Sequence, residues 1–323
     1  MRRALRLLVV TALLGALAGA VPTVRAAAAP RPQASTTAPA QTAPQTATVR
    51  YGPFTIPAAA GEEHGMIRNA FRFLVAKPCS NCMLTSIKPN LVYPDGSTAN
   101  VDTGPMLHHM VLASWGESDP TCGSSFLGLI GRRFFAAGNE RTSIPVMQGY
   151  GIPVQWYDSW NLIYDLMNMD SASKTVYIEL KFSYVPGMTL TPVTPVWFDM
   201  DQCGDSEYSI PAGRSTARWD WNVNVPGRMI GTGGHVHTEG HGLYTKMTNV
   251  STGQTICQSN ATYGGSPGYT DMMGDPWISN MSICAGTPLT TVSRGQTIRL
   301  ETVYDSPEAR NDVMGINIAY IAP

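Results

Sequence analysis

The feature that most constrains the fold is an alternation of apolar and polar residues with a period of two. In residues 175–185 (TVYIELKFSYV), the side chains of Val176, Ile178, Leu180 and Phe182 fall on one face of an extended chain. The same pattern recurs in three further segments, at residues 217–225, 297–305 and 314–322. A strand with one face buried and one face in water has this pattern, and it is typical of antiparallel sheets.

Turn signals and a low charge content support an all-β fold. Only 14% of the residues are charged, whereas the chain contains 31 glycines and 24 prolines. Turn sequences such as PDGS (94–97) separate the expected strands, and residues 124–135 are the one stretch where we expect a short helix. A proline-rich stretch at 186–197 divides the chain. We therefore predict two antiparallel, jelly-roll-like β-sandwich domains side by side, at residues 49–190 and 191–323.

The N-terminus predicts export. Residues 1–26 combine arginines, an apolar run from Leu7 to Ala20 and small residues at Val24 and Ala26, as in a secretory signal peptide. The alternative is a membrane anchor, but the run is shorter than the ~20 residues that a spanning helix needs. Residues 27–48, rich in Ala, Pro, Thr and Gln, are expected to form a disordered linker. The mature protein is thus predicted to be secreted, without a membrane span.

Charge and cysteine content narrow the possible partners and the compartment. The net charge is −1, and the four arginines of residues 1–26 leave a mature chain near −5, which argues against nucleic acid as a partner. All six cysteines lie after the leader, and an even number in an exported protein predicts three disulfides. Cys79 and Cys82 form a CxxC pair, which could also indicate zinc binding or redox activity, but no second CxxC and no thioredoxin-like βαβ context accompany it.

Five of the six histidines occur in two clusters. In GGHVHTEGHG (233–242), His235 and His237 are two residues apart. In a strand they would project from the same face about 7 Å apart and could bind one metal ion, while Val236 points into the core. The alternative is a pair of exposed or hydrogen-bonded histidines. Any further metal ligand must come from elsewhere in the chain.

The second cluster is the adjacent pair His108 and His109 in PMLHHMVLAS (105–114). Neighbouring residues of a regular strand point to opposite faces, so both can bind one ion only at a bulge, a strand end or with an unusual rotamer. Otherwise one histidine is packed and the other exposed. The sequence lacks the HExxH motif of zinc proteases and the GxSxG motif of serine hydrolases.

These motifs together resemble the copper type II, ascorbate-dependent monooxygenases, the family of peptidylglycine α-hydroxylating monooxygenase and dopamine β-monooxygenase. LHHMVLAS (107–114) is similar to the HHM motif of the N-terminal domain, and GHVHTEGHG (234–242) to the HxH strand of the C-terminal domain. NDVMGINIAYI (311–321) is similar to the terminal strand that carries a methionine ligand. The segments with PCSNCML and LVYPDGSTANVDTGPMLHH also resemble the stress-up-regulated nodulin group.

The resemblance implies two copper sites in two β-sandwiches about a solvent-filled cleft. His235, His237 and Met314 would form the site where oxygen and substrate react, and a thioether supports Cu(I). Met314 also fits a packed core residue of the last strand. His108 and His109 would belong to an electron-transfer site. One or two copper ions, and ascorbate or another reductant, are thus the expected cofactors.

This sequence departs from the family pattern at two places. The third histidine of the electron-transfer site is missing from residues 161–180, where Asp165 is the candidate replacement and His64 a more distant one. Gly233 stands where the peptide-amidating members have an arginine that clamps a carboxylate. Glycine-extended peptides are therefore not the expected substrate.

Two functions follow from the sequence. One is a secreted copper monooxygenase that hydroxylates a C–H bond of a small molecule or peptide with O2 and a reductant. The other is a non-catalytic copper-binding or surface-interaction protein that retains a single copper site, and the missing third histidine is its motivation.

Overall fold

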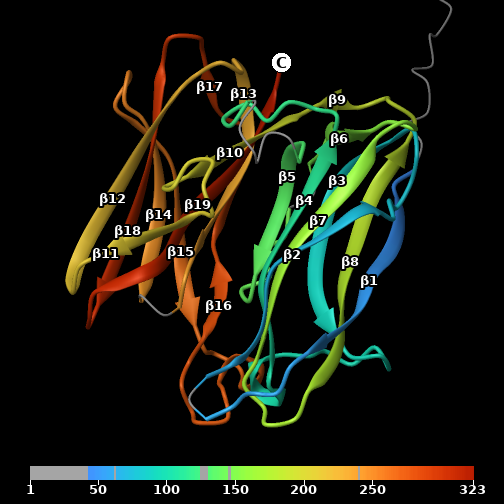
Figure 1. The fold of residues 1–323 in the computed structure, drawn as a ribbon. Coiled ribbons are helices and arrows are strands. Elements are labelled where there is room, and N and C mark those ends of the chain that lie inside the picture. The colour runs from blue at the N-terminus through green and yellow to red at the C-terminus, as the bar shows by residue number, and fades with distance from the viewer. Residues whose placement is uncertain (1–42, 62, 124–129, 145–146, 239–240) are drawn as a thin grey trace, which may run out of the picture. The chain divides into compact units, whose positions relative to one another are not determined.

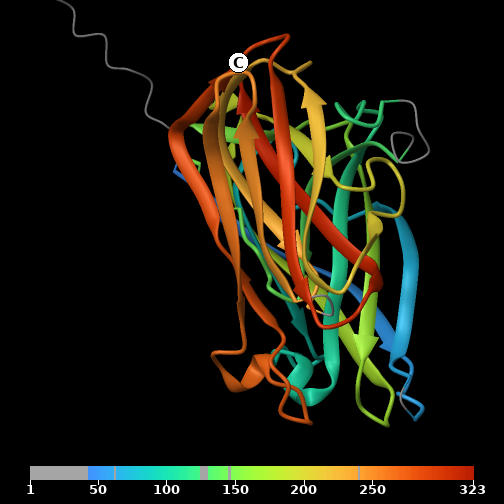
Figure 2. The ribbon, with the colours of Figure 1, turned by 90° about the vertical axis from the view of Figure 1, so that its left-hand side faces the viewer.

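The computed structural model describes residues 43–61, 63–123, 130–144, 147–238 and 241–323, and in these ranges nearly all regular structure is β-strand. Four sheets stack face to face in the order in which they are numbered below (Figure 1). Figure 2 views the stack from the side of sheet 4. The predicted signal peptide and most of the predicted linker lie outside the described residues.

Sheets 1 and 2 form the first sandwich. Sheet 1 contains, in spatial order, β1 (Gln45–Ile56), β8 (Lys174–Pro186), β3 (Cys82–Val92), β6 (Tyr150–Val154) and β9 (Thr191–Pro192). Sheet 2 contains β2 (Gly65–Val75), β7 (Ser159–Asn168), β4 (Pro105–Trp115) and β5 (Arg132–Gly138).

Sheets 3 and 4 form the second sandwich. Sheet 3 contains β10 (Thr194–Asp199), β19 (Arg310–Ala322), β13 (Gly227–Val236) and β17 (Ile283–Val292), and β11 (Glu207–Ile210) also pairs with β19. Sheet 4 contains β12 (Gly213–Asn222), β18 (Thr297–Ser306), β14 (Gly242–Asn249), β15 (Gln254–Tyr263) and β16 (Ile278–Met281). Short 3₁₀ turns occur at Val101–Thr103 and Pro267–Tyr269.

The alternation in the sequence corresponds to the buried faces of the strands. In β8, Val176, Ile178, Leu180 and Phe182 are fully buried between sheets 1 and 2. The antiparallel β-sandwich prediction is therefore confirmed. The strand pairs are antiparallel throughout the described residues except for β6 and β9, which are parallel.

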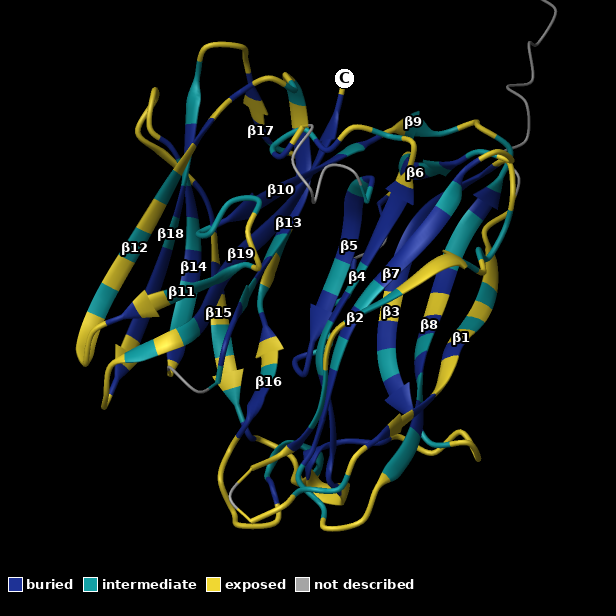
Figure 3. Cartoon of the chain, viewed as in Figure 1, coloured by how far each residue is buried: buried dark blue, intermediate teal, exposed yellow. Residues whose placement is uncertain are grey.

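Sheet 3 is covered on both faces, which places the last strand in the middle of the molecule. Ile316 and Ile318 of β19 belong to the hydrophobic cluster that includes sheet 2, whereas Ala319 and Ile321 pack in the cluster shared with sheet 4. Figure 3 shows β19, β13, β4 and β5 largely in the colour of buried residues. The two sandwiches thus meet through sheets 2 and 3, and residues Gln41–Pro323 form one compact unit.

Two local expectations differ from the structure. Residues 132–135 of the expected helix belong to strand β5, where Phe134 and Phe135 are buried, and residues 124–129 lie outside the described part. Two consecutive phenylalanines favour a strand that is covered on both faces, as sheet 2 is. Strand β1 begins at Gln45, inside the range assigned to the linker, because the residues from 45 onward pair with β8.

Three disulfides are present, as predicted, and they settle the pairing. They join Cys79 to Cys82, Cys122 to Cys203 and Cys257 to Cys284. Cys122–Cys203 connects the segment before β5 to the segment after β10, and so links the two sandwiches covalently. Among the described residues, no helix has the length and apolar character needed to cross a bilayer.

Candidate metal centre

A bulge in β4 lets two adjacent histidines point the same way. In the β4–β7 ladder, Leu107 pairs with Leu166 and His109 with Asp165, so His108 is the extra residue. An extra residue interrupts the strict alternation of side chains. The rings of His108 and His109 accordingly lie with their centroids 4.1 Å apart, both half-buried.

The second histidine pair lies at the end of β13. His235 is in the strand and His237 follows its last residue, with the completely buried Val236 between them. The hydroxyl of Tyr304 lies 2.8 Å from the His237 backbone nitrogen and accepts its hydrogen bond. Both imidazoles therefore face sheet 2, while Val236 anchors the strand in the second sandwich.

The two pairs meet in one cluster at the junction of sheets 2 and 3. The Nε2 atoms of His109 and His237 are 2.8 Å apart, and their rings are stacked with centroids 4.9 Å apart. One ring nitrogen from each of His108, His109 and His237 lies within 4.8 Å of the other two. The His235 ring centroid is 5.1 Å from that of His109. The resemblance implied two separate sites on either side of a cleft. Among the described residues, the rings of the two histidine pairs are instead in contact, so no cleft separates them.

A main-chain carbonyl determines which nitrogen of His237 faces the cluster. Nδ1 of His237 lies 2.6 Å from the carbonyl oxygen of Asp312, which can only accept, so Nδ1 carries the proton. In neutral His237, Nε2 then offers a lone pair toward His109. Metal-binding histidines are commonly oriented by a hydrogen bond of this kind.

His235 is held by a buried carboxylate from the other sandwich. Nδ1 of His235 lies 3.0 Å from Oε1 of Glu140, whose side chain is 1% exposed. A Cβ atom on Gly138 would lie 2.7 Å from Cε1 of His235, so glycine is needed there for the approach. Burial alone would raise the pKa of Glu140, but His235 outweighs it and holds this pKa below its usual value. Glu140 is therefore ionised at neutral pH.

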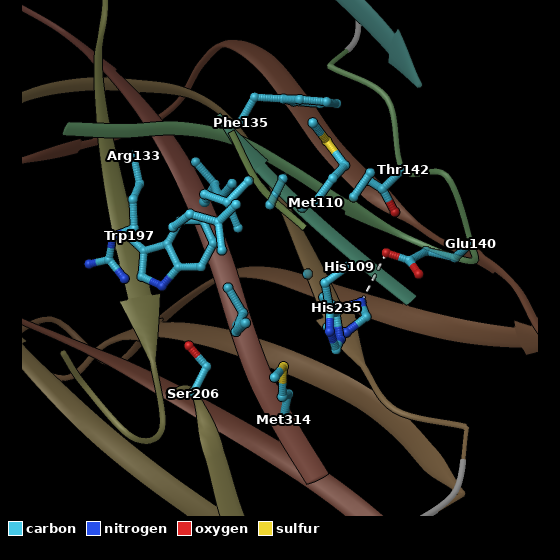
Figure 4. Close-up of a pocket in the computed structure, with 18 of the residues that line it drawn as sticks. His109, Met110, Arg133, Phe135, Glu140, Thr142, Trp197, Ser206, His235 and Met314 are labelled. Carbon is cyan, nitrogen blue, oxygen red and sulfur yellow. Dashed lines mark hydrogen bonds and ion pairs between the residues drawn. The ribbon is translucent and has the colours of Figure 1, made fainter. Parts of the chain in front are cut away.

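An apolar cavity of about 170 Å³ opens beside the cluster. His109, His235 and Met314 line it together with apolar side chains such as Met110 and Phe135. Figure 4 shows Met314 near His235 on the cavity wall, with Trp197 and Arg133 toward one side and Glu140 and Thr142 toward the other. Met314 is 7% exposed, so it is both a wall of this cavity and a core residue.

A polar cavity of about 630 Å³ lies on the other side of the cluster. His108 and His237 line it together with Arg68 and the exposed His64. The histidine cluster thus separates an apolar cavity from a charged one. His64 borders the cluster without joining the close group of ring nitrogens.

Asp165 is near the cluster but outside the close group. It lines the apolar cavity and pairs with His109 across the ladder, and its Oδ1 accepts a hydrogen bond from the backbone of Asn69. Burial raises the pKa of Asp165. The structure thus places this candidate replacement ligand beside His109, while the third ring nitrogen of the close group belongs to His237 of the other sandwich.

Known proteins with related sequences match most of the chain. The probable copper-dependent oxygenase M1 of Phoma sp. is 28% identical over 288 residues, which are 84% of this chain and 71% of that protein. The probable copper-dependent oxygenase clz3 of Cochliobolus lunatus is 30% identical over 247 residues, which are 72% of this chain and 77% of that protein. The chain belongs to the family of these probable copper-dependent oxygenases.

A second match concerns the C-terminal half. The family described as Stress up-regulated Nod 19 matches residues 184–323, which contain His235, His237 and Met314 but not the segments near residues 78–109 that suggested it. The solved structure of PBCV-1 VP54, fitted into a reconstruction of the virophage Sputnik, is 9% identical. The match covers 88% of this chain and 95% of that chain, with a TM-score of 0.31. The two relatives and the family match support the copper oxygenase likeness without naming the ascorbate-dependent type II monooxygenases.

The donor set of this family member fits copper. Ring nitrogens of three imidazoles lie within 4.8 Å of one another, and imidazole binds both zinc and copper well. A thioether stands at the adjacent cavity wall, and sulfur of this kind favours Cu(I) over harder cations. Buried imidazoles that stay neutral keep their lone pairs available for a metal.

Stability of the metal-free protein is expected to fall below about pH 6.5. Burial, then the positive charges of the neighbouring imidazoles, lower the pKa of His108 and His109 well below the usual value. The unfolded chain therefore takes up protons that the folded chain refuses, and each histidine removes at most ~1.4 kcal/mol of stability per pH unit. Urea unfolding between about pH 7.5 and about pH 5.5 measures this loss. The double variant His108→Gln/His109→Gln should show a flatter dependence, and an equal slope in both proteins would contradict the assignment.

Two contributors to the site could not be read from the sequence. Glu140 is one glutamate in a turn, and no motif marks it. The Asp312 carbonyl is a main-chain group two residues before Met314, and only the pairing of the strands brings it to His237. The bulge at His108 did have a signal in the sequence. Two adjacent histidines can bind one ion only at a bulge, at a strand end or with an unusual rotamer, and the structure has the first of these.

Proposed function

We propose that this protein is a secreted copper-dependent oxygenase that hydroxylates a C–H bond of a small molecule, using O2 and a reductant. The observation that carries the proposal is the convergence of histidines from both sandwiches on the wall of an apolar cavity. The names of the two curated relatives point to the same chemistry. The three disulfides support export, because such bonds persist in oxidising compartments.

His108, His109 and His237 would hold the copper, with His235 and Met314 at the face toward the apolar cavity. Copper bound in this way supplies one-electron redox chemistry toward O2. The carbonyl of Asp312 keeps Nε2 of His237 pointed into the cluster.

The apolar cavity would receive the substrate. Its walls are mostly apolar, so a bound substrate would displace water from the face of the cluster lined by His109, His235 and Met314. Exclusion of water protects reactive species from side reactions and strengthens the local electrostatic interactions. The polar cavity lined by His108 and His237 would admit the reductant, ascorbate or another polar donor, so electrons and substrate would approach from opposite sides.

One observation favours a second function, a non-catalytic copper-binding protein. The four histidines form one cluster. A hydroxylation that takes one electron from each of two separate copper sites needs two such sites. Such a protein would bind copper but would consume no O2 when a reductant is added. Oxygen consumption therefore separates the two functions.

Replacing Met314 with leucine is expected to lower reductant-dependent O2 uptake of the copper-loaded protein at least about tenfold. Leucine preserves the apolar volume of this core position to a good approximation, so the change removes mainly the sulfur. Uptake is measured with an oxygen electrode after addition of ascorbate. The matched control is Met110→Leu, which makes the same change in another wall of the same cavity and should retain the rate. A full rate in Met314→Leu would overturn the role of this residue.

A further inference from the structure

At one end of the apolar cavity, two polar side chains carry oxygen atoms that lack a hydrogen-bond partner; Arg133 and Ser206 line the other end. Oε2 of Glu140 and Oγ1 of Thr142 are both buried, and neither has a partner among the described residues. Both residues line the cavity, and Figure 4 shows their side chains next to each other on the side away from Trp197, with the Glu140 oxygen that meets His235 nearer to Thr142 than the unpaired one. Buried polar atoms are normally paired, so two orphaned atoms at one end of a cavity indicate a missing ligand group.

We propose that the substrate is a compact, neutral, apolar molecule whose hydroxyl group binds between Glu140 and Thr142. The hydroxyl would donate to Oε2 of Glu140 and accept from the hydroxyl of Thr142. A hydroxyl is both donor and acceptor, so a single group satisfies both orphaned atoms. This substrate class rests on the proposed function and extends it.

The surroundings of Glu140 disfavour a charged substrate group. A substrate carboxylate would face a buried carboxylate at close range, and like charges in such a place are strongly unfavourable. A substrate ammonium would compete with His235, which already pairs with Glu140 at 3.0 Å. It would also approach a histidine cluster that is expected to hold a cation. A neutral hydroxyl meets neither obstacle.

The remaining walls determine the size and character of the rest of the molecule. From Glu140 and Thr142 the cavity passes His235 and Met314 to Trp197 (Figure 4). Its volume of about 170 Å³ is close to that of a cavity of ~150 Å³ that is known to bind benzene. A molecule anchored by its hydroxyl would thus place its apolar body beside His235 and Met314, where the oxidation is proposed to occur.

Phenol, toluene and benzoate test the proposal, because they share a ring and differ in one substituent. Each is titrated by ligand-observed NMR into the full chain, loaded with Cu(I) under anaerobic conditions and again without metal. Phenol is expected to bind about fivefold more tightly than toluene, as one net hydrogen bond allows, and benzoate at least about tenfold more weakly than phenol. The preference should be the same with and without copper, because neither Glu140 nor Thr142 is a proposed ligand.

Thr142 offers a matched pair of variants. Thr142→Val removes the hydroxyl at nearly constant volume and should abolish the preference for phenol, whereas Thr142→Ser should retain it. Glu140→Gln should improve benzoate binding, because it removes the opposing charge. Equal binding of phenol and toluene by the unaltered protein, or an unchanged preference in Thr142→Val, would overturn the proposal. These results concern binding alone, so they stand apart from a failure to consume O2, which would overturn the oxygenase function instead.

Discussion

Replacement of His237 with alanine is expected to lower the affinity for copper by more than about a hundredfold. Loss of a contact that merely supports a metal ligand typically lowers affinity ~10–100-fold, and His237 is a candidate ligand itself. Its Nε2 lies 2.8 Å from Nε2 of His109, and its ring is 5.4 Å from that of His108, so it joins both histidines of β4 to the second sandwich. Titration of the Cu(I) protein against a competing chelator measures the change.

His241→Ala is the control for this experiment. His241 follows in the same segment but is exposed, and it is absent from the close group of ring nitrogens. Its replacement should leave the copper affinity unchanged. Two independent sites would behave differently, because His237→Ala would then leave the copper at His108 and His109 bound as tightly as before. Retention of part of the copper at full affinity would therefore contradict a single shared cluster.

The strands could be predicted well because their burial is encoded locally. Val176, Ile178, Leu180 and Phe182 alternate along β8, and each one is buried as the pattern requires. Val236 points into the core between the histidines that flank it. A period of two follows from the geometry of any strand, so it can be recognised without knowledge of the neighbouring strands.

The single cluster could not be predicted because it depends on how two sheets pack. His108 and His109 belong to sheet 2, and His235 and His237 to sheet 3, and no local pattern specifies how those sheets face each other. Glu140 shows the same limit, since its partner His235 is distant in the sequence and lies on the other sandwich. The resemblance to a family with two copper sites indicated the candidate ligands. It also implied that the two histidine pairs lie apart, whereas the packing of sheets 2 and 3 brings them together.

The covalent link between the sandwiches should therefore matter both for stability and for the site. Cys122 and Cys203 are 81 residues apart in the sequence, and their disulfide closes a large loop. By the loop-entropy relation, its removal in Cys122→Ser/Cys203→Ser is expected to lower the free energy of unfolding by about 4.5 kcal/mol. The same relation gives about 2 kcal/mol for Cys79→Ser/Cys82→Ser, whose residues are only 3 apart.

Chemical denaturation of the two double variants measures this difference, and the copper affinity of each tests its consequence for the site. Arg133 of β5 lies over the ring of Trp197 of β10 at 4.5 Å and donates to Sγ of Cys122, so the disulfide adjoins the contact between sheets 2 and 3. Because the cluster takes histidines from both of these sheets, the Cys122/Cys203 variant should also bind copper more weakly. The Cys79/Cys82 variant alters only the first sandwich and should bind copper normally. Equal losses of stability in the two variants, or undiminished copper affinity in the first, would show that packing alone fixes the relative position of the sandwiches.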